Sequence, residues 1–548
     1  MTGSRPRGLT LGTLLLASTL LAPAFARAGI VVDGNATDWF GQLPPSDNTA
    51  RIARRSDGAG ELVWRDATGD ARGSAAARAC DLTQLRVSGD ADRLYVLARC
   101  TGPVTVSGDS AWQVQVSFDL NRFVGLGGSN FLGPDAPAVT PDAAWEYLVQ
   151  TRFGSGQGAR LVDNWGNELV GAVAAVHASG VCEISVPWSS LGLSFVPTDP
   201  IRVCAASFLS NASDEILPAG DGNAWRAADV VTQYALAGSG STLSELADGV
   251  VDHSLDAYFD GRGACIAPIV VNEEFFEGGI NSQWLEIVNV SQSVLPLSQF
   301  KIGDAETPGM NEAMARFPSG ILLEPGQAFV VAYRGATFLT ENGLRAGAEC
   351  TSSDGGTPDM LPFTGWAPNV GFNIPNSGDA VLVLDRTNTV VDVVTYKNAT
   401  YPGVRARPAV AALHSLERNS PNGDTDDCAT DFADRVTPTP AQVMQFTGVE
   451  DVAVAGTRWA GAYPMPSAGH VHLTLQLGEA VSGGQRVELL DVSGRRVREL
   501  ALPAHDMGRM TIEWDGRDSG GQAAAAGVYF ARVRVAGRAM VQRLVIAR

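Results

Sequence analysis

Apolar and polar residues alternate in short runs along most of the chain. Residues 284–289 (Trp-Leu-Glu-Ile-Val-Asn) and residues 470–477 are clear examples. A period of two predicts half-buried β-strands. Turn signals separate the runs, such as Pro325-Gly326 before residues 329–333. Long amphipathic helical patterns are hard to find, so the pattern predicts an all-β protein, and its length suggests three or four domains.

The stretch from residue 266 to 440 carries a set of motifs in a fixed order. They are VVNE, WLEIVN, L-x-PGQ-x-FVV, NSGDAVLVLD, VVDVVTY and a closing SLER…DT-x-D…F…TP. The ordered set resembles the lamin-tail domain family, an immunoglobulin-like β-sandwich. This resemblance implies a fold and an occurrence in secreted multidomain proteins, but by itself it implies no activity.

Residues 1–28 have the pattern of a cleaved secretory signal peptide. Arg5 and Arg7 form a basic region, residues 9–21 form a short apolar region, and Ala26-Arg27-Ala28 offers small residues for cleavage before Gly29. A membrane anchor would need about 20 apolar residues. No later stretch is long and apolar enough to span, so we expect no transmembrane segment in the mature chain.

Residues 29–260 form the first predicted domain. Its motifs VDGNATDW, D-x-TGD…DLTQLRV…DRLYVLA and EISVPWSSLG resemble the DOMON-like and family-9 carbohydrate-binding-module-like domains of secreted bacterial proteins. The resemblance implies a β-sandwich that binds sugar or another small ligand on aromatic side chains. The candidates are Trp112, Trp145 and Trp165, although a tryptophan in a strand is more often part of a core.

Three acidic residues of the first domain lie around predicted turns. Asp66, Asp70 and Asp81 could together hold calcium, which prefers oxygen ligands. Turn chemistry explains aspartate at these positions equally well. The sequence therefore leaves calcium as a possible cofactor and names no other.

Residues 446–548 form the third predicted domain. Alternating runs at residues 470–477, 487–492 and 527–533 are joined by turns such as Asp515-Gly516. The ordered set resembles the FlgD-type immunoglobulin-like fold, which is shared with C-terminal sorting domains of the type IX secretion system. That resemblance implies contact with export machinery and a location on the outer surface of a Gram-negative-type bacterium. Pro464-Met465-Pro466 only approximates the usual Asn-Pro pair, so an ordinary accessory sandwich is the alternative.

The seven cysteines suggest disulfides in an exported protein. Cys80 and Cys100 flank a predicted hairpin, and Cys182 and Cys204 close a segment with two strand-like runs, so we predict these two pairs. Three cysteines remain for the central domain. Cys265 with Cys428 would tie its two ends together, and Cys350 with Cys428 would pin a loop; the sequence does not decide between them.

Charge and motif content narrow the function. The chain has 59 acidic and 40 basic residues, and loss of residues 1–28, which hold three Arg and no acid, would take its net charge from −19 to −22. This balance argues against nucleic-acid binding, which depends on Lys and Arg. No Gly-x-Ser-x-Gly, His-Glu-x-x-His or phosphate-loop motif is present. His470 and His472 share one strand face, where they could ligate a metal but more often face solvent.

We therefore predict a secreted, cell-surface protein of three tandem β-sandwiches without catalytic residues. Its expected partners are polysaccharide or a surface protein, together with export machinery that contacts the third domain. Two alternatives remain open. One is an extracellular hydrolase with an unrecognised site in residues 29–260, and the other is a passive structural protein of the surface.

Overall fold

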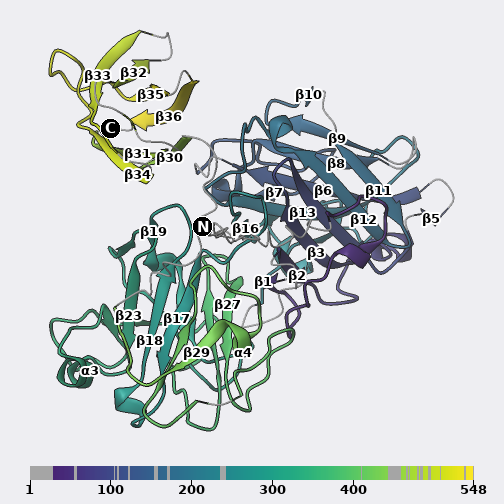
Figure 1. Cartoon of the computed structure of the whole chain (residues 1–548). Helices are drawn as coiled ribbons and strands as arrows, with labels where there is room; N and C mark the ends of the chain where they lie inside the picture. Colours follow the sequence, from purple (N-terminus) through teal and green to yellow (C-terminus); the bar gives the residue numbers. More distant parts are fainter. Residues whose placement is uncertain are drawn as a thin grey trace, which may run out of the picture.

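The computed structural model describes residues 29–546 apart from short gaps. The gaps are residues 55–58, 104, 108–109, 121–123, 153–157, 170–172, 235–241, 409, 442–457, 464–466, 468, 478–480, 482–484, 492–494, 506–507 and 536–537. The predicted signal peptide, residues 1–28, lies outside the described residues. The structure confirms an all-β, multidomain fold (Figure 1). Across the described segments, no helix has the length and apolar character needed to cross a membrane.

The first domain is a sandwich of two sheets. One half belongs to a larger sheet and comprises, in order, β11 (Ala174–Ala178), β12 (Val181–Pro187), β4 (Arg93–Cys100), β3 (Leu82–Gly89), β2 (Gly60–Arg65) and β1 (Thr49–Arg54). The facing sheet, which we call the second sheet, comprises β10 (Glu168–Leu169), β9 (Gly158–Asp163), β8 (Tyr147–Arg152), β6 (Ser110–Asp119), β13 (Ile201–Ser210) and β14 (Ala227–Val230), with β5 (Thr105–Ser107) on β6 and β16 (Leu255–Ala257) on β13. Alternation along β6 points Trp112, Val114, Val116 and Phe118 into the main core.

The central domain continues the larger sheet of the first domain. β1 pairs in parallel with β27 through Arg51 and Val390. The sheet then extends through β27 (Val390–Thr395), β26 (Ala380–Leu384), β20 (Lys301–Gly303), β21 (Met314–Arg316) and β25 (Leu361–Pro362), which gives eleven strands among the described residues. The opposite sheet comprises β24 (Ala348–Glu349), β23 (Ala328–Ala332), β18 (Trp284–Asn289), β17 (Ile269–Phe275), β28 (Ser415–Arg418) and β29 (Phe432–Arg435). One hydrophobic cluster contains residues of both domains, so the two sandwiches share a core.

Ion pairs also join the first two domains. Arg51 and Arg54 lie on β1, and both reach a loop of the central domain that precedes α4 (Cys428–Asp431). Arg51 Nη2 lies 3.1 Å from Asp426, and Arg54 Nε lies 3.3 Å from Asp424. The N–H of Arg54 also donates to Asp426 at 2.6 Å. The boundary between the two domains is therefore a packed interface with its own polar contacts.

The remaining elements are short. They are the strand pairs β7 (Ala138–Val139) with β15 (Val250–Val251) and β19 (Leu295–Pro296) with β22 (Leu322–Leu323), the helices α1 (Ala75–Arg78), α2 (Thr242–Glu245) and α3 (Gly335–Asn342), and the 3₁₀ turns η1 (Ala36–Asp38), η2 (Pro141–Ala143), η3 (Trp188–Leu191), η4 (Ile280–Ser282) and η5 (Leu297–Gln299). Most of these elements lie in connections between the sheets, so strands carry the architecture.

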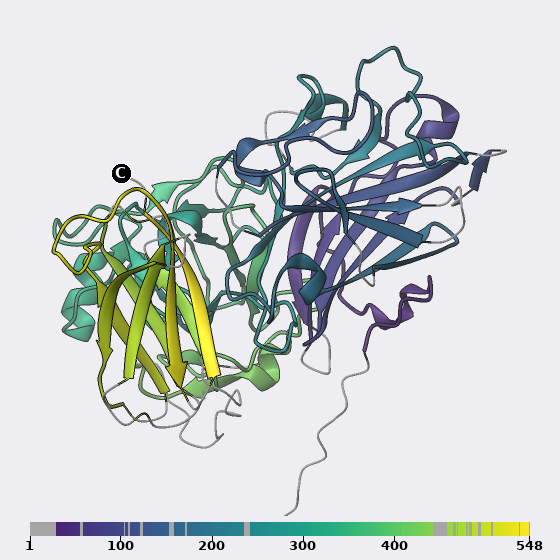
Figure 2. The ribbon, with the colours of Figure 1, turned by 90° about the horizontal axis from the view of Figure 1, so that it is seen from above.

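The C-terminal domain is a separate small sandwich with its own core (Figures 1 and 2). One sheet comprises β30 (Arg458–Tyr463), β31 (Val471–Leu477) and β34 (Gly508–Trp514). The other comprises β33 (Arg496–Leu502), β32 (Gln485–Asp491), β35 (Gly527–Val535) and β36 (Arg538–Ile546). Trp514 and Tyr529 pack edge to face inside it, with ring centres 5.4 Å apart. Residues 442–457, which connect it to the central domain, lie outside the described residues.

The predicted disulfides do not form in this structure. All seven cysteines are described, and all are free. Cys182 lies on β12 and faces the main core, whereas Cys204 lies on β13 in the other sheet and faces a separate cluster on its outer side. The Cys100 thiol donates to the backbone carbonyl of Cys80 at 3.4 Å. These two pairs are therefore corrected to buried single thiols.

The three cysteines assigned to the central domain form no disulfide either, and Cys265 and Cys428 contact different strands. The Cys265 thiol donates to the carbonyl of Val87 on β3 at 3.2 Å. The Cys428 sulfur instead accepts from the N–H of Thr395 on β27 at 3.4 Å. Cys350 is partly exposed and unpaired by disulfide. Burial raises the pKa of both Cys265 and Cys428 to about 12, which suppresses the thiolate needed for disulfide exchange.

Gly60 permits close contact between β2 and the segment that leaves the first domain. A Cβ atom at this position would lie 1.8 Å from the carbonyl oxygen of Cys265. We expect Gly60→Ala to lower the free energy of unfolding by about 1–3 kcal/mol, because the backbone must move to relieve this overlap. Urea denaturation followed by tryptophan fluorescence measures the change.

Gly158→Ala is the matched control. Gly158 also lies on a strand of the first domain, but a Cβ there would have no atom within 4 Å. We expect its stability to stay the same or to rise by up to about 1 kcal/mol. Equal losses in the two variants would contradict the proposed contact at Gly60.

Candidate functional site

Three aspartates from distant parts of the sequence meet where the two sheets of the first domain join. Asp66 directly follows β2, Asp70 lies in the loop beyond it, and Asp229 lies on β14 of the second sheet. One carboxylate oxygen of each lies within 4.8 Å of the other two. We call these three residues the acidic centre. The acidic centre therefore brings together carboxylates from both sheets, and all three side chains are acidic.

The hydrogen bonds of Asp66 and Asp70 leave several oxygens free. Asp66 Oδ1 accepts from the N–H of Ala67 at 2.9 Å and from the hydroxyl of Thr232 at 3.3 Å. Asp66 Oδ2 and both oxygens of Asp70 are buried and accept no hydrogen bond from described residues. Asp66 is only 2% exposed. A buried carboxylate oxygen without a donor is costly, so these oxygens are suited to a cation.

Asp229 is held from two sides. Its Oδ2 accepts from the N–H of Leu82 at 2.7 Å, and its Oδ1 accepts from the hydroxyl of Thr242 at the start of α2. Asp81 plays a different part, because its carboxylate accepts from the N–H groups of Gly69 and Ala71, each at 3.0 Å. Asp81 therefore fixes the loop that carries Asp70 and does not belong to the acidic centre.

Burial and mutual repulsion dominate the electrostatics of the acidic centre. Burial raises the pKa of Asp66, and the charges of Asp229 and Asp70 raise it further. Burial and then the charge of Asp81 raise the pKa of Asp70 to about 6. Arg65 and Arg72 are close in sequence to Asp66 and Asp70, but they pair with Asp47 and Asp221 instead, each at 2.7 Å. No basic side chain of the described residues forms an ion pair with the acidic centre.

The sequence motif thus located two of the three residues. Asp66 and Asp70 were predicted together with Asp81, whereas Asp229 was missed. Its sequence signal is weak but present: Ala-Ala-Asp-Val-Val at residues 227–231 places one acid inside an otherwise apolar strand. A charged residue at a buried strand position requires polar partners, and those of Asp229 are the N–H of Leu82 and the hydroxyl of Thr242.

The three predicted sugar-stacking tryptophans have different environments. Trp112 is fully buried in the main core, and Trp145 is 4% exposed in the outer cluster of the second sheet. Neither presents a ring face to solvent, so both are corrected to core residues. Trp165 is 81% exposed in the turn between β9 and β10, where its N–H donates to Asp163 at 3.0 Å. Only Trp165 of the three could stack against a ligand.

A polar hollow lies on the outer face of the second sheet. It has a volume of about 460 Å³, and we call it the groove. Gln150 and Arg152 of β8 and Arg160 of β9 line it, together with residues 132–134 and 212–216. Arg160 donates to Gln150, which in turn donates to Gln113 at 2.8 Å. Trp165 does not line the groove, and sequence reasoning had not singled out Gln150, Arg152 or Arg160.

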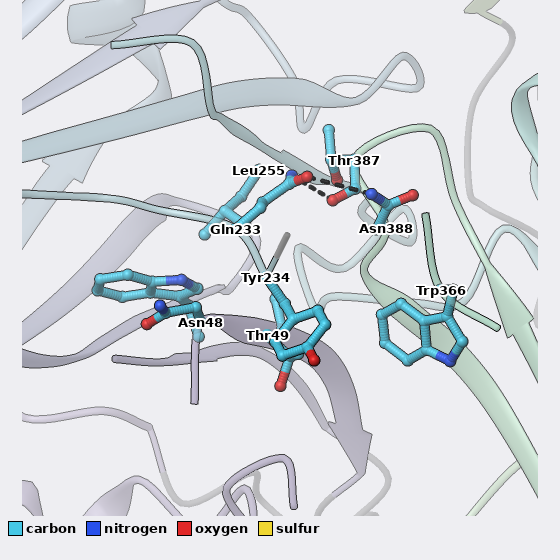
Figure 3. Close-up of a pocket in the computed structure, with 10 residues that line it drawn as sticks. Asn48, Thr49, Gln233, Tyr234, Leu255, Trp366, Thr387 and Asn388 are labelled. Carbon is cyan, nitrogen blue, oxygen red and sulfur yellow. Dashed lines mark hydrogen bonds between the residues drawn. The ribbon is translucent and has the colours of Figure 1, made fainter. Parts of the chain in front are cut away.

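A second cavity lies between the first and central domains (Figure 3). Gln233 of the first domain donates to the carbonyl of Thr387, and Asn388 donates back to Gln233 at 3.2 Å. The cavity has a volume of about 10 Å³. That volume holds about one water molecule. The cavity is therefore a small gap in the interface between the two domains and is too small for an organic ligand.

Three solved structures that are similar to the chain have low identity to it. FlgD from P. aeruginosa is 22% identical and aligns over 16% of this chain and 67% of its own, with a TM-score of 0.14. A DUF4876 family protein from Bacteroides thetaiotaomicron is 11% identical over 63% of this chain and 97% of its own, with a TM-score of 0.26. Dimeric latent PorU from Porphyromonas gingivalis is 13% identical over 83% of this chain and 31% of its own, with a TM-score of 0.16.

Family comparison matches two parts of the chain. No curated protein matches it. The Lamin Tail Domain family matches residues 265–398, within the central sandwich, and the FlgD Ig-like domain family matches residues 465–538. Both matches agree with the order of motifs in the sequence. The chain therefore carries a lamin tail domain in its centre, followed by a FlgD Ig-like domain.

Proposed function

We propose that this protein is an extracellular, cell-surface binding protein without catalytic activity, and that its first domain binds an acidic polysaccharide in the groove. The groove is the observation that carries the proposal. Its volume of about 460 Å³ falls in the range of about 300–1,000 Å³ common for ligand sites. Its polar side chains come from adjacent paired strands, which hold them in fixed positions.

The groove is lined by two arginines, Arg152 and Arg160, and by two acids, Asp214 and Glu215, and an acidic ligand would bind at its Arg160 side. Arg152 pairs with Glu168 at 2.9 Å, but Arg160 has a hydrogen bond to Gln150 and no ion pair with any described residue. Burial and the positive charge of Arg152 lower the pKa of Arg160. A carboxylate ligand would relieve this repulsion and accept two parallel hydrogen bonds from a guanidinium. A polysaccharide that contains uronic acids supplies such carboxylates along with hydroxyl groups for Gln150.

Affinity electrophoresis of the full chain in gels with polygalacturonate or with neutral dextran tests this proposal. We expect retardation by the acidic polymer only, and at least a tenfold weaker affinity for Arg160→Ala. Arg405→Ala is the control, because Arg405 is an exposed arginine of the central domain, paired with Asp427 at 3.2 Å. Equal affinities of the two variants, or no retardation of the wild type, would refute the groove as the site.

Two further outcomes separate the alternatives. Release of reducing ends from the polymer would favour an extracellular hydrolase with its site in residues 29–260. Loss of binding in Trp165→Ala alone would place sugar contact at the exposed turn between β9 and β10 instead. A surface protein as ligand would be indicated by binding to whole cells that persists after the polysaccharide is digested.

The acidic centre supports a second part of the proposal, a structural calcium ion. Asp66 Oδ2 and the two oxygens of Asp70 have no donor, and Asp229 brings a third carboxylate from the opposite sheet. Calcium takes six to eight oxygen ligands and accepts carboxylates in flexible geometry, so it suits this donor set better than a metal that prefers nitrogen or sulfur. The ion would join the two sheets that support the groove.

The C-terminal domain supports a role in location. We propose that it directs export or holds the protein at the outer surface, as the resemblance to type IX sorting domains implies. Deletion of residues 446–548 in the producing bacterium is expected to leave the protein inside the cell envelope. Surface display of the deleted chain at the wild-type level would contradict this role and would favour an ordinary accessory sandwich.

A further inference from the structure

Two histidines and a glutamate meet on the exposed face of one sheet of the C-terminal domain. His470 immediately precedes β31, His472 lies on β31, and Glu513 lies directly opposite His472 on β34. The residues that alternate with them along the strand, Val471 and Leu473, are fully buried. Strand alternation therefore turns both imidazoles away from the core and onto the side of Glu513. We call these three residues the His-His-Glu cluster.

The distances within the His-His-Glu cluster are close to those of ligands around a shared ion. His472 Nδ1 lies 3.4 Å from Glu513 Oε1, and His470 Nε2 lies 3.7 Å from Glu513 Oε2. Well-formed hydrogen bonds are shorter, at about 2.7–3.2 Å. Zinc bonds of about 2.0–2.2 Å in tetrahedral geometry place neighbouring ligand atoms about 3.3–3.6 Å apart. One ligand atom of each residue lies within 4.8 Å of the other two, so only small side-chain rotations are needed.

The backbone that carries the cluster is held in place. Ser467 Oγ donates to the carbonyl of His470 at 2.6 Å and accepts from the N–H of Gly469 at 3.0 Å. Gly516 packs so closely against this turn that a Cβ would lie 1.9 Å from the carbonyl oxygen of Gly469. His472 and Glu513 sit within a continuous antiparallel ladder. Ligands on such rigid elements lose little conformational freedom when they bind a metal.

We propose that the His-His-Glu cluster binds a divalent transition metal of the zinc type. Two imidazoles and one carboxylate are a common donor set for such ions, whereas calcium would be poorly served by nitrogen. The three side chains are 54%, 37% and 63% exposed. The ion would therefore keep at least one coordination position open to water or to a ligand from another molecule. This site is chemically distinct from the acidic centre, whose donors are all oxygen.

Isothermal titration of the full chain with zinc tests the proposal, with calcium in excess so that the acidic centre does not compete. We expect one zinc ion per chain at pH 7.5, and at least a tenfold loss of affinity in each of His470→Ala, His472→Ala and Glu513→Gln. His414→Ala is the matched control. His414 Nδ1 lies 2.7 Å from Asp434, which makes an isolated histidine–acid pair of the central domain, and its loss is expected to leave zinc affinity unchanged.

Cobalt absorption gives a second readout that does not depend on affinity. Substitution by Co²⁺ is expected to give visible bands of a nitrogen and oxygen site without the near-ultraviolet bands of thiolate ligands. Thiolate bands would assign the metal to the free cysteines and overturn the proposal. Equal zinc binding by wild type and by the double variant His470→Ala/His472→Ala would also overturn it. The substitutions are at exposed positions, so the fold should survive them, which thermal denaturation checks.

Discussion

Replacement of Arg418 by Met is expected to lower the free energy of unfolding of the first two domains by about 3–5 kcal/mol at pH 8. Arg418 is 1% exposed. Its guanidinium lies 3.1 Å from Asp392, 3.1 Å from Asp424 and 3.7 Å from Asp431. Met fills a similar volume but leaves these buried carboxylates without their cation. Guanidinium denaturation at fixed pH measures the loss.

The size of this loss should depend on pH. Burial raises the pKa of Asp392 to about 7, although Arg418 opposes the shift. Since the unfolded value is about 3.9, the folded state binds more protons than the unfolded state, and the contribution of Asp392 to stability falls as pH rises through this interval. The variant can protonate Asp392 at pH 5, so its deficit should shrink there.

Arg405→Met is the control for Arg418→Met. Arg405 also pairs with an acid of the central domain, Asp427, but its side chain is 72% exposed. An exposed ion pair contributes about 0–1 kcal/mol, so we expect almost no change. The prediction is wrong if Arg418→Met loses as little free energy of unfolding as Arg405→Met, or if its loss is the same at pH 5 and pH 8. Arg418 would then not be the group that stabilises the buried carboxylates.

Removal of calcium is expected to destabilise the first two domains by about 4 kcal/mol, if the ion is supplied at a thousandfold its dissociation constant. Differential scanning calorimetry with saturating calcium and with chelator measures the difference. Asp70→Asn and Asp229→Asn should remove most of the response to calcium. In chelator, Asp70→Asn should equal or exceed the wild type in stability, because it removes one repelling charge from the acidic centre, whereas Asp229→Asn should be less stable because its amide nitrogen would face a backbone N–H.

Asp81→Asn separates metal binding from loop structure. Asp81 accepts three contacts from backbone N–H groups of its loop. Its loss should lower the melting temperature with and without calcium and leave most of the calcium response in place. If the melting temperature of the wild type is the same in calcium and in chelator, the acidic centre does not bind calcium. Protonation of its carboxyl groups would then relieve their repulsion.

Local pattern predicted the strands well, because burial on one face of a sheet imposes a period of two. It did not predict which face belongs to which core. In residues 112–119 the sequence Trp-Gln-Val-Gln-Val-Ser-Phe-Asp places Trp112 with the apolar set, and the structure buries it there. The same alternation that indicated a strand therefore argued against Trp112 as a sugar platform.

Contacts between residues far apart in the chain could not be predicted from the sequence pattern. Nothing near Arg51 indicates that β1 will meet β27, and nothing near Asp66 points to Asp229. These contacts arise because two sheets are brought together by the packing of the whole sandwich. The predicted disulfide between Cys182 and Cys204 was wrong for the same reason. The two cysteines are close in sequence, but they lie on strands of opposite sheets. Family resemblance identified the central and C-terminal domains, but not the sheet that the central domain shares with the first.

The pairing of β1 with the central domain has a consequence for the time course of synthesis. Arg51 and its partner on β27, Val390, are 339 residues apart in the sequence (390 − 51). A ribosome that adds about 5–20 residues per second needs about 20–70 s to cover that distance. Throughout this interval β1 is an open strand edge, which invites pairing with other chains, and charged side chains on an edge discourage it. Arg51 and Arg54 are the charged side chains on this edge, and in the finished structure they join the two domains.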